Sequence, residues 1–381
     1  MNKRQALPLI AIDGSRAFLK RRTGIEEYSY QVIKHLRNEL SEASVVLYIR
    51  SDQAVDFDVP SNWRVKKLWA PRLWTQVRLS LEMLLHTPDV LFVPAHTVPL
   101  IHPKHTAVVI HGLEYEFCRE AYSMWSRVCM RAAIRFSCRV AKTVICVSEN
   151  TKRDVMRVYG TPKERITVVH EGYENTVGNR RSTKQNQHPY FLFIGRLEER
   201  KNIVRLIEAF ALAKETYGFS HRLILVGKPG YGYERIKEAI VDRRLALNVM
   251  QPDDAEKQPI RNDIVELGYV TDVEKWDLLK NTDGFLFATL YEGFGIPVLE
   301  AQYMGAPVIT SKTSSLPEVA GEGALLVDPE SAQEIAEAMG WLVSDNELKS
   351  DIMQKGLENV KRFSWEKCAK EIGVLLKEGG N

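Results

Sequence analysis

Two glutamates flank the predicted start of a helix near residue 297. Glu292 precedes that helix, and Glu300 lies on its first turn, eight residues later. Pro297 supports this start, because proline is tolerated in the first turn of a helix. The free N–H groups at a helix start suit a phosphate or a sugar oxygen. In the preceding loop, the expected contacts come from Gly293, Phe294, Gly295 and Ile296.

Two cations occupy a second loop, which follows a predicted strand ending at Gly195. Arg196 would offer a planar fork of donors to phosphate oxygens, and Lys201 would offer a compact point charge. Together they would neutralise a diphosphate held at the end of a strand. The two loops therefore predict a site for phosphate and sugar oxygens.

For each of these residues considered alone, an interpretation without a ligand also stays open. Glu292 and Glu300 would also be explained as solvated carboxylates that complement a helix dipole, and the cations as solvent-facing side chains. A dinucleotide-binding loop is poorly supported, because it needs the pattern G-x-G-x-x-G. Val298 and Arg235 stand where the two candidate segments would need the third glycine.

Short apolar segments alternate with helix-length segments along the first 175 residues. The segment 24–40 repeats apolar residues at helical spacing, after an apolar run that ends at Asp13 and Gly14. Short apolar runs are typical of parallel strands buried on both faces. We therefore predict an α/β domain with a parallel sheet over residues 1–175. Its predicted strands are 7–12, 45–49, 90–93, 106–110, 143–147 and 167–169.

A polar segment, 176–188, predicts a surface linker, after which a second α/β series begins. Residues 176–361 are the predicted second domain, and doubly wound domains bind ligands at the carboxyl ends of their strands. Residues 362–381 contain a last amphipathic helix, with Ser364 as its N-cap. In the second domain the predicted strands are 190–194, 222–226, 264–266, 284–287 and 307–310, and the predicted helices are 203–214, 234–245, 273–280 and one from residue 297.

At these motifs the chain resembles the retaining glycosyltransferases of family 4, which have the GT-B fold. The segment from Gly195 to Asn202 resembles the family's G-R-x-x-x-x-K-N diphosphate signature, and the segment from Glu292 to Glu300 matches its E-x7-E motif. The resemblance covers most of residues 190–330. It implies two Rossmann-like, doubly wound domains that face each other across a cleft, with the last helix crossing back to the first domain.

The resemblance also implies a role for each residue of the two motifs. Arg196 and Lys201 would bind the donor diphosphate and stabilise it as it departs. Glu292 would contact hydroxyl groups of the donor sugar, and Glu300 would accept hydrogen bonds from the ribose. The backbone from Phe294 to Ile296 would hold the sugar and the phosphate. The residues beside the nucleotide base would be Tyr269 and Val270.

The first domain carries a looser form of the family pattern. His111 stands where the family has a histidine that approaches the donor sugar, while Gly112 replaces a common aspartate. Gly24 begins a helix start that resembles the family's G-I-G-x-Y segment over the phosphates, but Glu26 replaces its second glycine. A histidine at a strand end is often structural, and that alternative stays open.

The resemblance implies transfer with retention at the anomeric carbon, by a front-face displacement that needs no protein nucleophile. The protein then supplies positioning and charge stabilisation. We expect neither a metal nor a cofactor, because cations and a helix start would neutralise the diphosphate. The expected donor is a GDP- or UDP-linked sugar, with a mannose-type sugar on GDP favoured. The alternatives are a non-catalytic GT-B protein that binds a nucleotide sugar or a glycan and, less favoured, an epimerase or a phosphorylase.

The composition is that of a folded, globular chain. The length of 381 residues is enough for about two domains. Of these residues, 45% are hydrophobic and 27% are charged. No apolar run approaches the ~20 residues of a spanning helix, and no signal core follows Met1. Five cysteines without a C-x-x-C pair give neither a disulfide framework nor zinc spacing. We expect a cytoplasmic protein with no nucleic-acid partner.

Charge is distributed unevenly along the chain, with a net +8 over residues 1–175 and −5 over the remainder. Arginines recur every four residues in the segment 119–142 and predict one basic stripe on a helix. A second basic and aromatic segment spans 63–78. Anionic lipids attract each nearby cation by about 1 kcal/mol, so we expect peripheral attachment to the inner membrane face and a glycan or lipid-linked oligosaccharide acceptor. A solvated helix face is the alternative. The stripe consists of Arg127, Arg131, Arg135 and Arg139.

Overall fold

The computed structural model describes residues 8–70, 73–173, 188–243, 245, 247–249 and 263–379. Its contacts divide the chain into two compact units. The first unit comprises Met1–Leu113, Met124–Gly172 and Phe363–Asn381, and the second comprises Glu114–Ser123 and Tyr173–Arg362. The sequence placed residues 114–123 in the first domain, whereas in the structure they pack with the second unit. Residues 176–187 of the predicted linker lie outside the described residues.

The first unit is built on a parallel sheet, with seven strands among its described residues in the order β3-β2-β1-β4-β5-β6-β7. The strand order reverses between β1 and β4, which makes the carboxyl ends of these strands the expected ligand-binding edge. The strands are β1 Leu9–Asp13, β2 Ser44–Arg50, β3 Trp63–Leu68, β4 Val90–Val93, β5 His105–Ile110, β6 Thr143–Cys146 and β7 Ile166–Val168. The helices are α1 Gly24–Glu39, η1 Trp74–Leu79, α2 Ser80–Leu85, α4 Met124–Val140, α5 Glu149–Tyr159, η3 Lys163–Arg165 and α13 Trp365–Glu378.

The second unit has its own parallel sheet, in the order β10-β11-β9-β8-β12-β13-β14 over the described residues. In this sheet the strand order reverses between β8 and β12, a place that we call the switch point of the sheet. The strands are β8 Tyr190–Ile194, β9 Arg222–Val226, β10 Leu247–Val249, β11 Ile264–Gly268, β12 Gly284–Phe287, β13 Val308–Ser311 and β14 Leu325–Val327. The helices are α3 Glu114–Phe117, η2 Arg119–Ala121, η4 Glu199–Lys201, α6 Ile203–Tyr217, α7 Tyr233–Asp242, α8 Asp272–Asn281, α9 Ile296–Tyr303, α10 Leu316–Ala320, α11 Ala332–Ser344, α12 Asn346–Asn359 and η5 Val360–Arg362.

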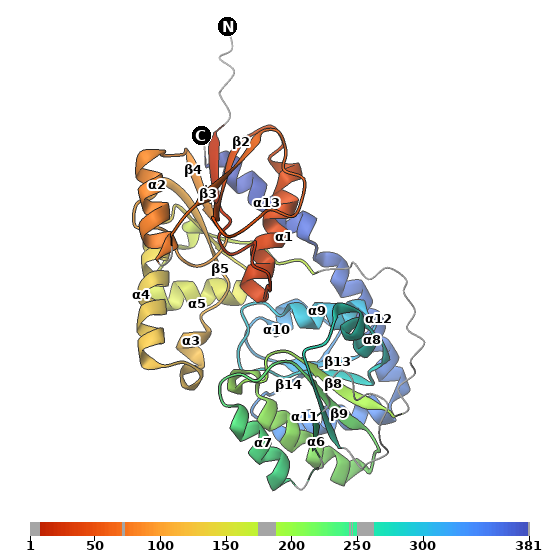
Figure 1. The fold of residues 1–381 in the computed structure, drawn as a ribbon. Coiled ribbons are helices and arrows are strands. Elements are labelled where there is room, and N and C mark those ends of the chain that lie inside the picture. Colours follow the sequence, from red (N-terminus) through yellow and green to blue (C-terminus); the bar gives the residue numbers. More distant parts are fainter. Residues whose placement is uncertain are drawn as a thin grey trace. The chain divides into compact units, whose positions relative to one another are not determined.

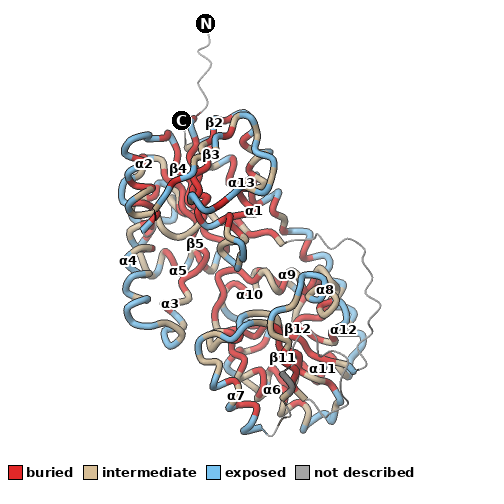
Figure 2. Tube along the Cα trace, viewed as in Figure 1, coloured by how far each residue is buried: buried red, intermediate tan, exposed pale blue. Residues whose placement is uncertain are grey.

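Both sheets are buried at their centres, as the continuous apolar strands predict (Figure 2). All four residues of β4 and all four of β12 are buried. Such strands have no solvent-facing side, so they are apolar at every position rather than at alternate ones. The two sheets with their covering helices confirm the predicted α/β class.

The last helix, α13, packs on α1 inside the first unit (Figure 1). Ser364 caps its start, with Oγ accepting a hydrogen bond from the Lys367 N–H at 3.1 Å. Trp365, Ile372 and Leu376 are buried on one face. Each large apolar side chain buried in this way contributes about 1.5–3 kcal/mol. The predicted return of the last helix to the first domain is confirmed.

Candidate functional site

The cations and carboxylates of the second unit meet at the switch point of its sheet. Gly195 and Arg196 follow β8, and Glu292 lies in the loop after its neighbour β12. Lys201 Nζ donates to Glu292 Oε1 at 2.6 Å. The structure therefore joins the two segments that the sequence singled out, although they are 91 residues apart.

Two glycines allow the loops at this edge to approach closely. Gly227 follows β9 with a φ of +148°, and a Cβ there would lie 1.8 Å from the carbonyl oxygen of Gly195. Gly295 has a φ of +126°, and a Cβ there would lie 2.8 Å from Leu316 Cδ2. At Gly227 any larger residue would push the loops after β8 and β9 apart, and at Gly295 it would strain the backbone. α9 begins at Ile296, directly after Gly295, as Pro297 predicts.

Asn202 fixes the turn that carries Lys201. Its backbone is in the left-handed region, with a φ of +61°. Its Nδ2 donates to the carbonyl oxygens of Ala288, at 2.9 Å, and Pro329, at 2.6 Å. The loop after β8 is thus tied to the loops after β12 and β14, and Lys201 is held rigidly.

The Lys201–Glu292 pair is buried, with 8% and 9% of each residue exposed. Burial lowers the pKa of Lys201, against the opposing effect of the Glu292 carboxylate. Burial alone would raise the pKa of Glu292, but the positive charges of Lys201 and Arg200 outweigh it and lower that pKa. The pair lies away from water, where charges interact strongly.

Arg200 is a residue of this site that the sequence did not single out. Its Nε lies 2.6 Å from Glu198 Oε1, and its Nη1 lies 3.5 Å from Glu292 Oε1. Burial disfavours its charge, but Glu292 and Glu198 more than compensate and raise its pKa. Arg200 falls at an unspecified position of the diphosphate signature, so only its neighbour Lys201 was a candidate. Two cations therefore share the Glu292 carboxylate.

Serines hold the loop around Glu292. The Glu292 N–H donates to Ser314 Oγ at 3.2 Å. The Ser315 hydroxyl lies 2.9 Å from the Glu292 carbonyl oxygen and 2.6 Å from that of Phe294. Phe294 is itself buried. The backbone from Gly293 to Ile296 is therefore fixed before any ligand binds.

Glu300 and the predicted base-side residues lie on neighbouring elements of the same unit. Lys275, from α8, donates to Glu300 Oε1 at 2.8 Å. Tyr269 follows β11 with 71% of the residue exposed, and Lys228 Nζ lies 5.5 Å from the centroid of its ring. Val270 instead packs against the core. An exposed aromatic ring is available for stacking, whereas Val270 serves the interior.

Arg196 differs from the other cations because it is exposed. Its side chain keeps 67% of its accessible surface, and its Nε lies 3.8 Å from Glu198 Oε2. An ion pair this exposed contributes little to stability. Arg196 therefore presents a positive charge at the surface, where a ligand can contact it.

The two predicted residues of the first unit lie at its carboxyl-end loops. His111 follows β5 and is buried, and Gly24 is the first residue of α1. Glu26, which stands where the family pattern has a glycine, helps to cap the N-terminus of α1. Its carboxylate accepts hydrogen bonds from the Thr23 hydroxyl at 2.6 Å and from the Thr23 N–H at 3.3 Å. This capping box replaces the close backbone approach that a glycine would allow.

A pocket of about 630 Å³ lies in the second unit beside Arg200. It is lined on one side by Phe117 and the residues that follow it, and Phe117 stacks on Tyr291 with ring centroids 4.9 Å apart. Such a volume is in the range of small-ligand sites. The pocket extends the site beyond the predicted residues. Its other walls include Glu199, Leu290, Thr313, Asp328 and Glu330.

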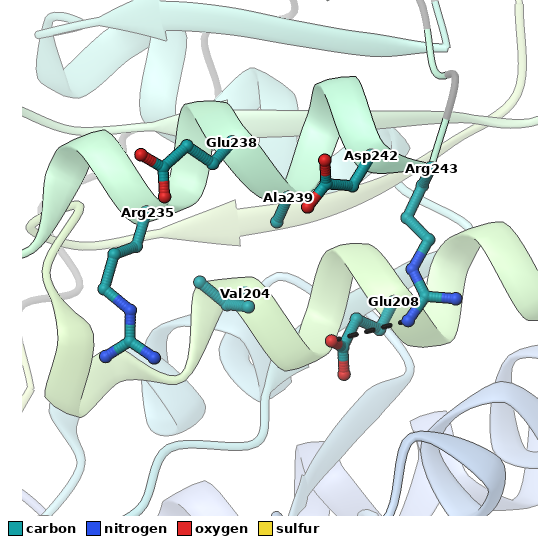
Figure 3. A pocket seen from close by; sticks show the side chains of 7 residues that line it. All are labelled: Val204, Glu208, Arg235, Glu238, Ala239, Asp242 and Arg243. Atoms are coloured by element: carbon teal, nitrogen blue, oxygen red, sulfur yellow. Dashed lines mark ion pairs between the residues drawn. The ribbon is translucent and has the colours of Figure 1, made fainter.

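A second pocket, of about 340 Å³, lies between α6 and α7 and contains no predicted site residue (Figure 3). Two of its charged side chains form an ion pair, in which Arg243 Nη2 lies 3.5 Å from Glu208 Oε1. We assign it no function.

In the described part of the chain, no three histidine, cysteine, aspartate or glutamate side chains are grouped so as to hold a metal ion. The sequence contains an Asp-x-Asp segment at Asp56 to Asp58, where Asp56 Oδ2 lies 3.8 Å from Arg22 Nη1. Among the described residues, no helix combines the length and the apolar character that crossing a bilayer requires.

Two family models match successive parts of the chain. The model described as glycosyl transferases group 1 matches residues 178–359, and the model described as glycosyltransferase family 4 matches residues 22–176. The first of these ranges contains both loops of the site in the second unit.

Individual relatives and solved structures are also similar to this chain. The chain is 26% identical over 274 residues to O-antigen chain mannosyltransferase B of Escherichia coli, covering 70% of this chain and 68% of the relative. Sucrose-phosphate synthase from Thermosynechococcus elongatus has the same fold, with a TM-score of 0.71, 17% identity and coverage of 97% and 98%. Anabaena HepE in complex with UDP-glucose gives a TM-score of 0.68, 16% identity and coverage of 97% and 100%. The likeness to these structures confirms the GT-B fold.

Proposed function

Because the chain belongs to glycosyltransferase family 4, we propose that it is a retaining enzyme that transfers a hexose from a nucleotide-diphosphate sugar to a glycan acceptor. One observation carries the proposal. Lys201 and Glu292 pair at 2.6 Å at the switch point of the second sheet, with the exposed Arg196 on the same loop. This arrangement supplies cations for a diphosphate and a carboxylate for sugar hydroxyl groups.

The proposed roles follow from charge and burial. Arg196 and Lys201 bind the diphosphate, and Glu292 accepts hydrogen bonds from the donor sugar while Lys201 and Arg200 keep it ionised. The fixed backbone from Phe294 to Ile296 contacts the sugar and phosphate. Glu300 binds the ribose, Tyr269 stacks beside the base, and Gly24 and His111 contribute from the first unit.

The proposed chemistry needs no protein nucleophile. As the bond from the anomeric carbon to the phosphate oxygen breaks, that oxygen takes the proton of the attacking acceptor hydroxyl on the same face. The protein's contribution is to hold both groups and to stabilise the negative charge that develops on the diphosphate. We propose that side-chain cations perform this neutralisation without a metal or a cofactor.

We propose GDP-mannose as the donor, with UDP-linked hexoses as the alternative. The mannosyltransferase among the relatives supports the first, and the UDP-glucose complex among the structural neighbours supports the second. The test is transfer from each donor to an octyl mannoside acceptor, followed by NMR of the product. Transfer with the donor's anomeric configuration retained is expected. An inverted product contradicts the mechanism, and donor binding without transfer indicates the non-catalytic alternative.

Replacing Glu300 with alanine should weaken nucleotide binding at least about tenfold, because a carboxylate that accepts two ribose hydroxyl groups is lost. Lys275, its partner at 2.8 Å, would also lose its ion pair. Calorimetric titration with GDP and UDP measures the effect. The matched control is Glu358→Ala, which removes a surface carboxylate that pairs with Lys361. Equal affinities for wild type and Glu300→Ala would contradict the ribose assignment.

We further propose that the acceptor is lipid-linked and that the first unit attaches to anionic membranes. The first ten residues of α4 include no buried residue, and Trp125 is 77% exposed beside the predicted arginine stripe. An apolar face also lies exposed along residues 73–85, whereas Trp74 within this range is buried. Apolar side chains beside cations suit a headgroup surface. The apolar face consists of Leu73, Val77, Leu81, Leu84 and Leu85.

Reversing the charge of Arg127, Arg131 and Arg135 to glutamate should abolish cosedimentation with phosphatidylglycerol vesicles at low salt. Wild type should bind those vesicles, and high salt should release it, because screening weakens exposed charge interactions. The control variant changes Lys355, Lys361 and Lys370 to glutamate, which alters net charge by the same amount elsewhere. Equal binding by both variants, or none by wild type, would leave the stripe as ordinary surface.

A further inference from the structure

His111 is buried at the end of β5, and both of its ring nitrogens face hydrogen-bond acceptors. Nε2 lies 2.8 Å from the carbonyl oxygen of Pro94, which follows β4. Nδ1 lies 3.1 Å from Oε1 of Glu171, near the point where the chain leaves the first unit. His111 and Glu171 are 7% and 6% exposed, so water does not compete freely for either partner.

The hydrogen-bond inventory requires a proton between Nδ1 and Glu171. A carbonyl oxygen can only accept, so Nε2 carries a hydrogen. A neutral imidazole has one N–H, which would leave the Nδ1 lone pair facing a carboxylate oxygen at 3.1 Å. Two facing lone pairs repel each other. Either the imidazole carries both hydrogens, or Glu171 is protonated and donates.

The basicity of the two groups and the neighbours of the pair favour the imidazole as the group that carries this proton. Imidazole is a stronger base than carboxylate by about two pKa units in water. Tyr28 from α1 lies edge-on at 4.4 Å between ring centroids, and burial raises its pKa, as it does that of Cys368 on α13, so both stay uncharged. Burial, and then the nearby His111, lower the pKa of His96, whose ring is 5.3 Å away. Two more distant charges act on these neighbours: Arg16 also lowers the pKa of His96, and Glu371 also raises that of Cys368.

We propose that Glu171 is a positioning residue that holds His111 as an imidazolium, with one N–H donated to Pro94 and the other to Glu171. Both ring nitrogens of His111 then have partners within the protein, so His111 does not act as a base and contributes to the proposed site through its charge. It provides a fixed positive charge and ties together the loop after β4, the end of β5 and the segment that leaves the unit. That segment is itself pressed onto α13, since a Cβ on Gly172 would lie 2.3 Å from the Trp365 nitrogen.

The consequence for catalysis rests on the proposed function. If His111 helps to position the donor sugar, its fixed orientation and charge depend on the Glu171 carboxylate. Glu171→Gln keeps the shape of the side chain but removes the charge. We expect it to lower kcat about tenfold, the effect of one lost charge-assisted hydrogen bond, while the donor KM stays within about twofold. Glu171→Asp, which retains a carboxylate, should recover most of the loss.

The direct test is NMR of the full-length protein labelled with ¹⁵N-histidine, at pH 7.5. Wild type should show an imidazole with two protonated ring nitrogens, and Glu171→Gln should convert that signal to a neutral ring. His221, which pairs with Asp283 in the second unit, is the internal control and should be unchanged. A single N–H on His111 in the wild type would overturn the proposal, as would a Glu171→Gln variant with wild-type kcat. The spectrum decides the charge state even if no donor is turned over, so this result is separable from the proposed function.

Discussion

Replacing Arg196 with alanine should lower turnover about a hundredfold or more and leave stability unchanged. The loss is expected because a single donor to a developing negative charge commonly accounts for about 3 kcal/mol of transition-state stabilisation. Stability should be unaffected because the side chain is 67% exposed and its ion pair with Glu198 is long, at 3.8 Å. Steady-state kinetics and thermal unfolding of the same preparation measure both quantities.

The matched control for this change is Arg205→Ala, which removes another partly exposed arginine of the second unit, on α6. It should match wild type in turnover and in melting temperature. If Arg196→Ala turned over donor within tenfold of wild type, the assignment of Arg196 to the diphosphate would be wrong.

Replacing Lys201 with alanine should have an equally large effect on turnover and should also destabilise the protein. Removing one partner of a buried ion pair commonly costs about 3–5 kcal/mol, because the other charge stays buried. Here Arg200, 3.5 Å from Glu292, retains part of the compensation, so we expect the lower end of that range. Thermal unfolding should show a drop of several degrees beside the kinetic loss.

The double variant Lys201→Ala, Glu292→Gln separates the two effects. It removes the unpaired charge, so stability should recover in part while turnover stays low. Full recovery of turnover would mean that the pair acts only structurally. A Lys201→Ala variant as stable as wild type would contradict the burial of the pair.

The fold was largely predictable because buried parallel strands are apolar at every position. The strands β4, β8, β9 and β12 lie where continuous apolar runs predicted them. The edge strand β3, Trp63–Leu68, was missed because three of its six residues are basic. It lies at the edge of the sheet, so burial on both faces does not constrain its composition. β10 and β14 were also missed; each has three residues and lies at an edge of the second sheet.

The motif residues of the site were predictable, whereas their partners were not. Lys201 and Glu292 stand at fixed positions of two motifs, and the structure brings them to 2.6 Å. Lys275 and Glu171 belong to no motif, since each is defined only by the residue it contacts across the fold. Nothing in the local sequence distinguishes such a residue from a surface charge.

Arg196 and Arg200 illustrate a second limit of sequence reasoning. Both lie in one eight-residue motif, yet the first is exposed and the second is held between two carboxylates. Their exposure depends on the path of the loop, which the contacts of Asn202 with Ala288 and Pro329 determine. These contacts span more than 80 residues of sequence. A motif therefore indicates which chemical groups a loop carries, but it does not indicate which of them is exposed to a ligand.

The most direct test of the account is release of nucleoside diphosphate from a panel of nucleotide sugars by the purified protein. The panel should contain GDP-mannose, UDP-glucose, UDP-galactose and UDP-N-acetylglucosamine, with wild type, Arg196→Ala and Lys201→Ala assayed in parallel. We predict that wild type consumes one donor, GDP-mannose, and that both variants do so at least about a hundredfold more slowly. Consumption of no donor by wild type, or equal consumption by all three proteins, would contradict a diphosphate site at Arg196 and Lys201.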